Sequence, residues 1–370
     1  MKEKRRILAI VSASYFFGAE KISLDVFKGL KNNGFSIHCI VSGWNDGDFI
    51  ERLKKNGISY TEVKLGWYYI SKLSWTLDSL IHYPGAILDF IKTKQSFIPH
   101  LYYTISYRQL VLLFPLIPSS SVIYNVQDSN AESRLSKFFL KLVDIKVKKY
   151  IACSNYIKND LIKCGIDANK IHVIHNGVEI LEKKSVFSNE ILTLGIVGQV
   201  IPRKGHKVLI EALRCLHERG VNLNLKIVGT GDVNFTKEIE YLVHQYGLEN
   251  SVSWSGFVKN YSEIYAGIDI LIAPTQNEEP FGLIAAEANM FGIPVIVSNK
   301  GGLTEIIEDG YNGYRFNADD AEDLACKILL LHEDRQKMKL MGLNGREKVI
   351  SNFSFERMNK SVLELINEQF

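Results

Sequence analysis

Two acidic residues, Glu279 and Glu287, lie in the segment EPFGLIAAE with seven residues between them. Residues 268–273 form an apolar run that predicts a buried strand, and residues 282–291 have helix-forming composition. Glu279 is therefore expected in the loop and Glu287 inside the helix. Carboxylates at these two places can accept hydrogen bonds from two hydroxyl groups that lie some distance apart.

The start of this predicted helix offers a second kind of chemistry. The backbone N–H groups of Phe281, Gly282 and Leu283 would have no partners inside the helix, and together they would attract an anion such as a phosphate. A second apolar run at residues 293–297 completes a strand–loop–helix–strand crossover, whose ligands bind where the strands end. A phosphate between two hydroxyl-binding acids is the pattern of a nucleotide-sugar site. The alternative is an ordinary crossover with two solvated glutamates.

Glu279 and Glu287, followed by GIPVIVSNKGGLTEII, resemble the E-x7-E motif of the retaining GT-B glycosyltransferases of family 4, also called glycosyltransferase group 1. The resemblance implies an α/β fold, GT-B, with two Rossmann-like domains facing each other across a cleft. It implies that Glu279 is the catalytic residue that binds sugar hydroxyls beside the reacting carbon. Glu287 would bind the ribose hydroxyls of the donor, and the configuration at the reacting carbon would be retained.

A basic loop in the second half is expected to bind the donor's diphosphate. The segment GQVIPRKGHKVLIEAL resembles the family's G-R-x-x-x-x-K-G loop, with Lys204 and Gly205 matching. Gln199 stands where the family has Arg, and Arg203 supplies a neighbouring cation. A diphosphate needs such compensation, and a helix that begins at Gly205 would add its N-terminus. An exposed charged turn is the alternative reading of Arg203 and Lys204.

Two residues of the first half complete the predicted site. Gly18 follows the first predicted strand and corresponds to the family's Gly-rich loop near the donor diphosphate, although it could be a turn residue only. Gln127 stands where many family members have His near the reacting sugar. An amide can hydrogen-bond a sugar hydroxyl but cannot transfer a proton near neutral pH, so the catalytic assignment of Gln127 leaves the proton acceptor open.

The nucleotide itself is expected to meet a Gly-rich turn and a backbone segment. The resemblance assigns Gly229 of the turn GTGD, and Phe257 and Val258, to the donor. It also implies that Gly301 and Gly302 approach the sugar or phosphate. A UDP-sugar is slightly favoured over a GDP-sugar. The sequence Asp46-Gly47-Asp48 is interpreted as a turn before a helix, and neither a metal nor another cofactor is expected.

The composition fits a two-domain globular protein. The chain has 370 residues, 46% of them hydrophobic, which predicts domains at 1–178 (acceptor side) and 179–352 (nucleotide-sugar side), with a helix at 353–370 that crosses back. A net charge of +3 implies no nucleic-acid partner. Five scattered cysteines indicate a reducing compartment, and no apolar run approaches the roughly 20 residues of a membrane span.

Aromatic and basic residues are mixed in the stretch from 67 to 118, which suits core packing, an acceptor cleft or a membrane interface. We therefore expect a cytoplasmic protein, peripheral on the inner face of the membrane through its N-terminal domain. The expected partners are a nucleotide sugar and a glycan or lipid-linked acceptor of bacterial cell-surface polysaccharide synthesis.

Two other functions stay open at this stage. One is a GT-B sugar-nucleotide epimerase, which would need acid/base side chains that Gln127 does not supply. The other is a non-catalytic nucleotide-sugar-binding partner subunit, which Gln127 and Gln199 make conceivable. Glu279, Glu287 and Lys204 count against the partner subunit, and donor consumption that depends on an acceptor would discriminate a hexosyltransferase from both.

Overall fold

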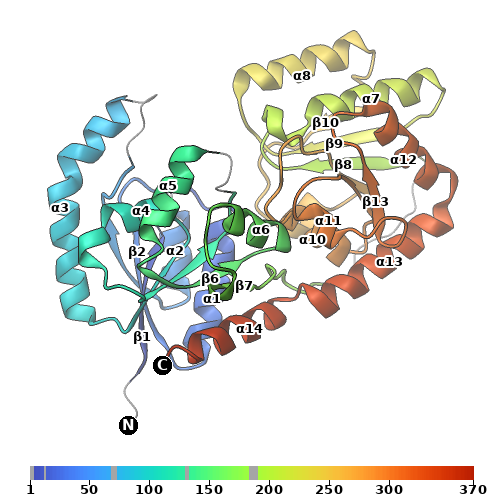
Figure 1. Ribbon diagram of the computed structural model, residues 1–370. Coiled ribbons are helices and arrows are strands. Elements are labelled where there is room, and N and C mark those ends of the chain that lie inside the picture. Colours follow the sequence, from blue (N-terminus) through green and yellow to red (C-terminus); the bar gives the residue numbers. More distant parts are fainter. Residues whose placement is uncertain (1–3, 12–13, 68–72, 130–132, 183–190) are drawn as a thin grey trace. The chain divides into compact units, whose positions relative to one another are not determined.

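The computed structural model describes residues 4–11, 14–67, 73–129, 133–182 and 191–370. The chain divides into two compact units (Figure 1). Unit 1 comprises Met1–Gly177 together with Glu356–Phe370, and unit 2 comprises Val178–Phe355. The chain thus passes between units at two points, and the last helix, α14 (Phe355–Asn367), belongs almost wholly to unit 1.

Unit 1 is built on a seven-stranded sheet in the order β3-β2-β1-β4-β5-β6-β7, and every pairing is parallel. The strands are β1 (Arg6–Val11), β2 (Ser36–Ser42), β3 (Ser59–Val63), β4 (Leu101–Thr104), β5 (Val122–Val126), β6 (Val147–Ala152) and β7 (Ile171–Val173). The helices besides α14 are α1 (Gly18–Asn32), α2 (Asp48–Lys55), α3 (Leu73–Phe97), α4 (Tyr107–Leu112), α5 (Arg134–Val143) and α6 (Asn155–Lys163), with short 3-10 turns η1 (Phe114–Leu116) and η2 (Ala168–Lys170).

Unit 2 is built on a six-stranded parallel sheet in the order β10-β9-β8-β11-β12-β13. Its strands are β8 (Thr193–Val197), β9 (Asn224–Val228), β10 (Val252–Trp254), β11 (Ile270–Ala273), β12 (Val295–Ser298) and β13 (Gly313–Phe316). Its helices are η3 (Pro202–Lys204), α7 (His206–Glu218), α8 (Val233–Gln245), α9 (Tyr261–Ile264), α10 (Leu283–Met290), α11 (Leu303–Ile306), α12 (Ala321–Glu333) and α13 (Arg335–Asn352).

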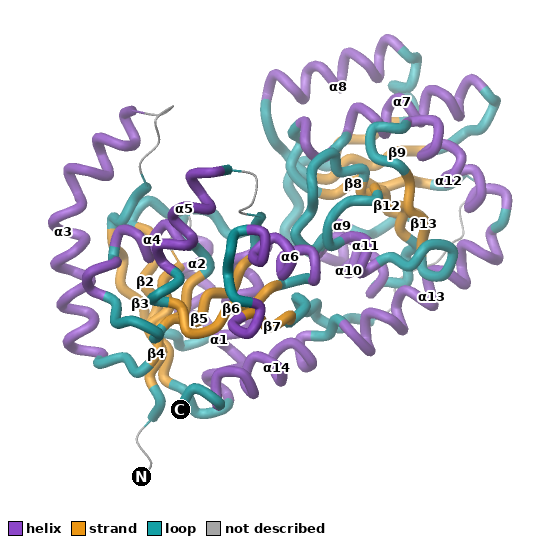
Figure 2. The backbone as a smooth tube through the Cα atoms, in the orientation of Figure 1, coloured by secondary structure: helices purple, strands orange, loops and turns teal. Residues whose placement is uncertain are grey.

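Continuous apolar runs form the central strands because both faces of each sheet are covered. Five successive residues of β1, from Ile7 to Val11, are fully buried, as are all four residues of β12. A strand that buries consecutive side chains must be covered on both faces, and parallel sheets have this arrangement. Figure 2 shows the helices packed around the strands in each unit.

Each sheet has one point where the strand order reverses. In unit 1 this point lies between β1 and β4, and in unit 2 it lies between β8 and β11. The loops that leave these neighbouring strands run in opposite directions and open a crevice at the carboxyl ends of the strands, where ligands of such sheets bind. In unit 2 the two loops are residues 198–205 and 274–282, which contain five of the predicted donor-binding residues (Gln199, Arg203, Lys204, Phe281 and Gly282) together with Glu279.

The aromatic stretch from 67 to 118 is divided between core and surface. Phe90 of α3 and Tyr103 of β4 are fully buried, whereas Trp75 of α3 is 57% exposed. Residues 68–72, which include Tyr68 and Tyr69, lie outside the described residues. The exposed side chains of α3 include Leu77, Leu80, Ile81 and Leu88, whereas those of its last turns include Lys92 and Gln95.

Within the described ranges, no helix has both the length and the apolar character that a membrane span requires. The five cysteines are free thiols; Cys39, Cys153, Cys164 and Cys215 are buried and Cys326 is exposed. None of the thiols is therefore held in a disulfide.

Candidate functional site

The loop after β8 carries the predicted diphosphate-binding cation, Lys204. Gly205, which precedes α7, has a left-handed φ of +75°, and a β-carbon there would overlap the carbonyl oxygen of Pro274. The amide of Gln276 donates to the carbonyl oxygen of Arg203 at 2.8 Å. Glycine is therefore needed where the loops after β8 and β11 meet. Arg203 is exposed, whereas the Lys204 side chain is only 18% exposed.

Lys204 contacts the predicted catalytic residue directly. Its Nζ atom lies 2.7 Å from Oε2 of Glu279, whose side chain is 19% exposed. Both residues line a small pocket together with Thr275, Gly282 and Leu303. The volume of this pocket is about 10 Å³, close to the space that one water molecule needs. Two residues predicted separately, 75 positions apart, are thus brought together.

Two glycines, Gly301 and Gly302, pack closely against the backbone of the loop that carries Glu279. The amide of Gly302 donates to the carbonyl oxygen of Glu279 at 2.7 Å. A β-carbon at Gly301 would overlap that same oxygen, and one at Gly302 would overlap the carbonyl oxygen of Pro280. The sequence predicted that these glycines let the backbone approach the donor; in the structure the close approach is made by the Glu279–Pro280 backbone.

Helix α10 begins in the pocket. It starts at Leu283, with Gly282 as its N-cap in a left-handed conformation (φ +96°), and a β-carbon at Gly282 would overlap the Leu303 side chain. The first N–H groups of an α-helix point away from its body without intrahelical partners, and they favour negative charge. The predicted anion site at Phe281, Gly282 and Leu283 is therefore next to Lys204.

Glu287 lies one helical turn further along α10 and has a partner that the sequence reasoning missed. Its side chain is buried, at 7% exposure, and its Oε2 accepts a hydrogen bond of 2.9 Å from the Tyr265 hydroxyl. Tyr265 follows α9, 22 residues earlier in the chain. No local sequence pattern joins the two residues, so only the fold could reveal this contact.

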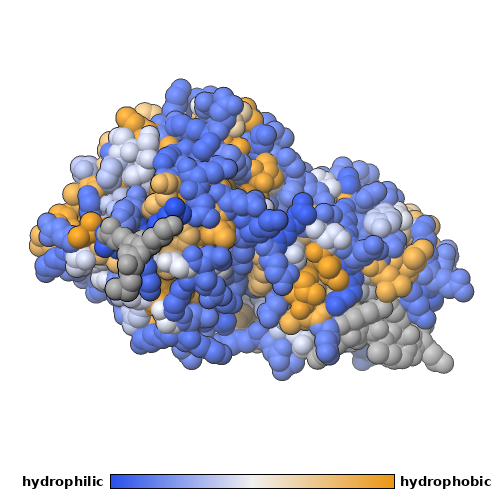
Figure 3. All heavy atoms as spheres, turned by 90° about the horizontal axis from the view of Figure 1, so that it is seen from below, coloured by the Kyte–Doolittle hydropathy of each residue, from blue (hydrophilic) through white to orange (hydrophobic). Residues whose placement is uncertain are grey.

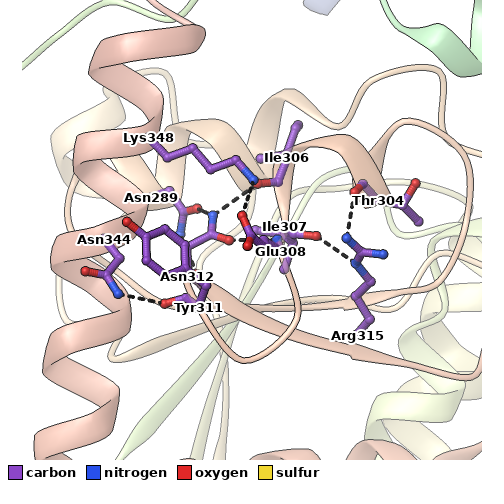
Figure 4. Close-up of polar contacts among 10 residues, drawn as sticks. All are labelled: Asn289, Thr304, Ile306, Ile307, Glu308, Tyr311, Asn312, Arg315, Asn344 and Lys348. Carbon is purple, nitrogen blue, oxygen red and sulfur yellow. Dashed lines mark hydrogen bonds and ion pairs between the residues drawn. The ribbon is translucent and has the colours of Figure 1, made fainter.

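Helix α10 is also fixed at its far end, by the network of Figure 4. The Asn312 side chain donates to Oδ1 of Asn289 at 2.7 Å and to the carbonyl oxygen of Ile306 at 3.1 Å. Its own Oδ1 accepts from the amide of Glu308 at 2.7 Å. Asn289 and Asn312 are fully buried, so these bonds are shielded from water. They anchor α10 two residues beyond Glu287.

The remaining donor-binding predictions fall on neighbouring loops of unit 2. Gly229 adopts φ +141°, and a β-carbon there would overlap the carbonyl oxygen of Gly198. The amide of Gly229 donates to the carbonyl oxygen of Gly256 at 2.8 Å, which places the segment of Phe257 and Val258 beside it. Phe257 is 64% exposed, and Gln199 is also exposed. None of the four lines the pocket of Lys204 and Glu279.

His206, the first residue of α7, is a buried histidine beside Lys204 that the sequence reasoning did not single out. Its side chain is 2% exposed, and its ring packs edge-on against Phe235 with centroids 6.3 Å apart. Neither ring nitrogen has a hydrogen-bond partner among the described residues. Burial, with a further contribution from the Lys204 charge, lowers the pKa of His206 to about 4. The ring is therefore neutral near pH 7.

Gly18 in unit 1 is the first residue of α1. The preceding amide, of Phe17, donates to Oε2 of Glu20 at 2.9 Å. Glu20 is buried, and burial raises the pKa of its carboxyl. The loop before α1 follows β1, so Gly18 lies near the point where the strand order of unit 1 reverses.

Gln127, the other predicted catalytic residue, follows β5 and is held by two buried asparagines. Its Nε2 donates to Oδ1 of Asn125 at 2.7 Å and to Oδ1 of Asn176 at 3.1 Å. Asn176 donates in return to Oε1 of Gln127 at 2.7 Å. Both N–H groups of the Gln127 amide are thus engaged, and the bond to Asn176 ties the end of β5 to the end of the first segment of unit 1, Met1–Gly177.

Across the described parts of both units, no group of three or more His, Cys, Asp or Glu residues is arranged to hold a metal ion. The sequence Asp46-Gly47-Asp48 is a turn that leads into α2, with Gly47 as the N-cap. Asp48 pairs with Arg52 at 3.4 Å.

Two family models cover most of the chain. The model described as Glycosyl transferases group 1 matches residues 178–348, and the model described as Glycosyltransferase Family 4 matches residues 18–180. An uncharacterized glycosyltransferase of Methanocaldococcus jannaschii is 31% identical over 63% of this chain and 63% of its own length. The capsular polysaccharide biosynthesis glycosyltransferase CapM of Staphylococcus aureus is 28% identical over 56% of each chain. The chain thus spans less than two thirds of these relatives.

Solved structures match the whole fold. HepE of Anabaena, in complex with UDP, has a TM-score of 0.82 at 22% identity and covers 98% of this chain and 100% of its own. A glycosyltransferase from Rickettsia africae has a TM-score of 0.82 at 24% identity, covering 99% and 98%. At these identities the likeness concerns the fold. The likeness shows the GT-B fold, and the two family models, which together span residues 18–348, show that the chain belongs to the group 1 glycosyltransferases.

Proposed function

We propose that this protein transfers a hexose from a nucleotide-sugar donor to a glycan or lipid-linked acceptor, with retention of configuration. One observation carries the proposal: Lys204, Glu279 and the N-cap of α10 line one pocket at the reversal point of the unit 2 sheet. A cation, a carboxylate and a helix N-terminus in one place can bind a diphosphate beside a sugar.

The donor's parts are assigned to these groups. Lys204 and the first amides of α10 would stabilise the charge on the departing diphosphate, with Arg203 and Gly18 as further contributors. Glu279 would accept hydrogen bonds from sugar hydroxyls, and Glu287 from the ribose hydroxyls. Gly229, Phe257 and Val258 would lie near the base.

The bond changes follow from this assignment. The bond between the sugar's anomeric carbon and the diphosphate oxygen breaks, and the acceptor oxygen bonds to that carbon from the same face. The acceptor's proton passes to the departing phosphate, because the Gln127 amide cannot take it. The products are the glycoside and the nucleoside diphosphate.

A UDP-sugar is the donor we favour, since HepE is described in complex with UDP and, in another structure, with UDP-glucose. Cell-surface polysaccharide is the acceptor class we favour, since CapM is named for capsular polysaccharide biosynthesis. We propose that no metal takes part. Transfer should therefore be unchanged by EDTA, and a rate that Mg²⁺ restores after EDTA treatment would contradict this.

We also propose that unit 1 contacts the membrane from the cytoplasmic side. Besides the exposed apolar side chains of α3, unit 1 exposes three on α5, and two cations lie next to these in the sequence. The three are Leu135, Phe138 and Leu142, and the cations are Arg134 and Lys141. Figure 3, which shows the molecule from below, has apolar patches on a mostly hydrophilic surface. Apolar side chains flanked by cations suit an anionic lipid surface.

The membrane proposal predicts co-sedimentation with vesicles of phosphatidylglycerol and phosphatidylcholine that weakens at high salt. The double variant L77S/I81S should reduce it, and Leu340→Ser, at a residue 57% exposed in unit 2, should not. Equal binding by all three proteins would contradict the contact.

A thermal-shift panel tests the donor proposal. A ligand that binds only the folded state raises Tm by mass action, by an amount equivalent to about 2.7 kcal/mol at 100 times its Kd. One class among UDP-, GDP-, ADP- and TDP-sugars should raise Tm of the wild type, and Lys204→Ala should lose the shift. Donor should then be consumed only when acceptor is present. If no nucleotide sugar raises Tm at millimolar concentration, the transferase proposal fails.

A further inference from the structure

Tyr265 lies at the back of the predicted ribose site. It follows α9, its side chain is 4% exposed, and its ring packs on Phe291 with centroids 5.2 Å apart. Its hydroxyl lies 2.9 Å from Oε2 of Glu287 and 3.4 Å from the carbonyl oxygen of Ile284. The ring is therefore held by packing, and its hydroxyl is aimed at α10.

The hydroxyl acts as a donor to the carboxylate. Burial, and then the neighbouring Glu287 charge, raise the pKa of Tyr265 well above its usual range, so the phenol keeps its proton. A hydrogen bond from a neutral donor to an ionised acceptor is shorter and stronger than one between neutral groups.

The structure assigns Tyr265 the role of a positioning residue for donor binding, in which its hydroxyl fixes the Glu287 carboxylate in the orientation that accepts the ribose hydroxyls. The assignment rests on the proposed function, in which Glu287 binds the ribose. Glutamate has several rotatable bonds, so a carboxylate that must meet two hydroxyls gains from a rigid partner. The aromatic ring, with two rotatable bonds and buried packing, is such a partner.

The position of Tyr265 in the chain extends this role. The segment of Phe257 and Val258, which we propose lies near the base, continues through α9 directly into Tyr265. One short segment therefore carries both the base contacts and the residue that orients the ribose contact. Nucleotide recognition would depend on the packing of this segment against α10.

Tyr265→Phe removes only the hydroxyl, and calorimetric titration with two probes tests its effect. The probes are UDP and its 2′,3′-dideoxy analogue, which lacks the ribose hydroxyls. Tyr265→Phe should raise the Kd for UDP roughly tenfold and change the Kd for the analogue less than about twofold. Tyr246→Phe, which removes a hydroxyl from α8's C-cap in the same unit, is the matched control and should change neither.

A double-mutant cycle separates positioning from general loosening of the fold. In the Glu287→Ala background, Tyr265→Phe should have no further effect on UDP affinity, because the residue through which it acts is gone. Additive effects, or an equal loss for both probes, would overturn the inference. If Tyr265→Phe binds UDP like the wild type, the inference alone fails. If the wild type binds neither UDP nor GDP, the donor proposal fails and the inference with it.

Discussion

The Nζ atom of Lys204 and the Oε2 atom of Glu279 lie 2.7 Å apart, so the predicted diphosphate-binding residue and the predicted sugar-binding residue form one ion pair. Both side chains are less than one fifth exposed. A partly buried pair of this kind is costly to break from one side, because the remaining charge loses its partner. A donor diphosphate could take the place of Glu279 beside Lys204, which leaves the carboxylate for the sugar.

The first prediction concerns this exchange. Glu279→Gln should leave UDP affinity unchanged or slightly higher, because Lys204 then has no competing carboxylate, while transfer falls at least roughly 100-fold. Lys204→Ala should weaken UDP binding by about 10- to 100-fold, since it removes hydrogen bonds to a charged group. Calorimetric titration and a transfer assay measure both quantities. Glu278→Gln, at an exposed neighbour, is the control.

A result in which Glu279→Gln weakens UDP binding as strongly as Lys204→Ala would contradict the exchange. It would mean that the ion pair as a whole, rather than Lys204 alone, holds the diphosphate site in shape.

The second prediction concerns Gly301, under the Glu279 loop. Gly301 and Gly310 both have left-handed φ, +50° and +79°, so alanine strains the backbone at either by about 1–2 kcal/mol. Only at Gly301 would the new β-carbon overlap the Glu279 carbonyl oxygen; at Gly310 nothing lies within 4 Å. Gly301→Ala should therefore lower Tm by several degrees more than Gly310→Ala, and it alone should reduce donor affinity. If Gly301→Ala and Gly310→Ala changed UDP affinity equally, Gly301 would have no specific role in shaping the donor site.

The framework of unit 2 could be predicted because buried parallel strands leave a direct trace in the sequence. The apolar runs at 268–273 and 293–297 contain β11 and most of β12, and the helix expected between them is α10. The sequence also predicts a helix that begins at Gly205, and Gly205 is the N-cap of α7. These features follow from residues that are close together in the chain, so they can be predicted from the sequence alone.

The contacts of the site could not be predicted, because they join distant residues through the fold. The pairs Lys204–Glu279 and Tyr265–Glu287 span 75 and 22 positions. The aromatic stretch shows the same limit: Phe90 and Trp75 both lie on α3, yet one is fully buried and the other is 57% exposed. The apolar stripe of a helix usually marks its covered side, but α3 has apolar side chains on its covered and its exposed sides, so its own sequence does not identify the covered one.

The third prediction concerns Gln127 and Asn176, whose side-chain amides pair through two hydrogen bonds. Gln127→Ala and Asn176→Ala should each lower the free energy of unfolding by about 1–3 kcal/mol, because each leaves a buried polar group without its partner. Together they should cost less than the sum of the single changes. Gln127→Glu should be worse than Gln127→Ala, because it brings a third acceptor to two carbonyl oxygens. Urea unfolding measures these effects, with exposed Gln95→Ala as the control.

If Gln127→Ala leaves stability unchanged but lowers the transfer rate, the amide pair does not support the fold. Gln127 would then act on the substrate, as the family resemblance implies, and its hydrogen bonds to Asn125 and Asn176 would serve to orient it.

The fourth prediction is a pH dependence that comes from His206. Burial lowers its pKa from an ordinary 6.5 to about 4, so between these values the unfolded chain binds a proton that the folded chain does not. Stability therefore falls as the pH drops from about 7 to about 4, by up to roughly 3 kcal/mol from this residue, and levels off below. His206→Leu should flatten this part of the profile. His206→Leu also removes two buried ring nitrogens that have no hydrogen-bond partner among the described residues, so the free energy of unfolding should not fall for loss of a hydrogen bond.

Calorimetric Tm values across pH 4–8 test this, with His217→Leu as the control. His217 lies on the same helix but is exposed, so its replacement should leave the slope unchanged. A wild-type slope that survives in His206→Leu would show that other groups cause the acid sensitivity. The Lys204 charge contributes to the lowered pKa of His206. Lys204→Ala should therefore reduce the dependence of Tm on pH slightly. A diphosphate bound beside Lys204 should have the same effect, because its negative charge offsets that of Lys204.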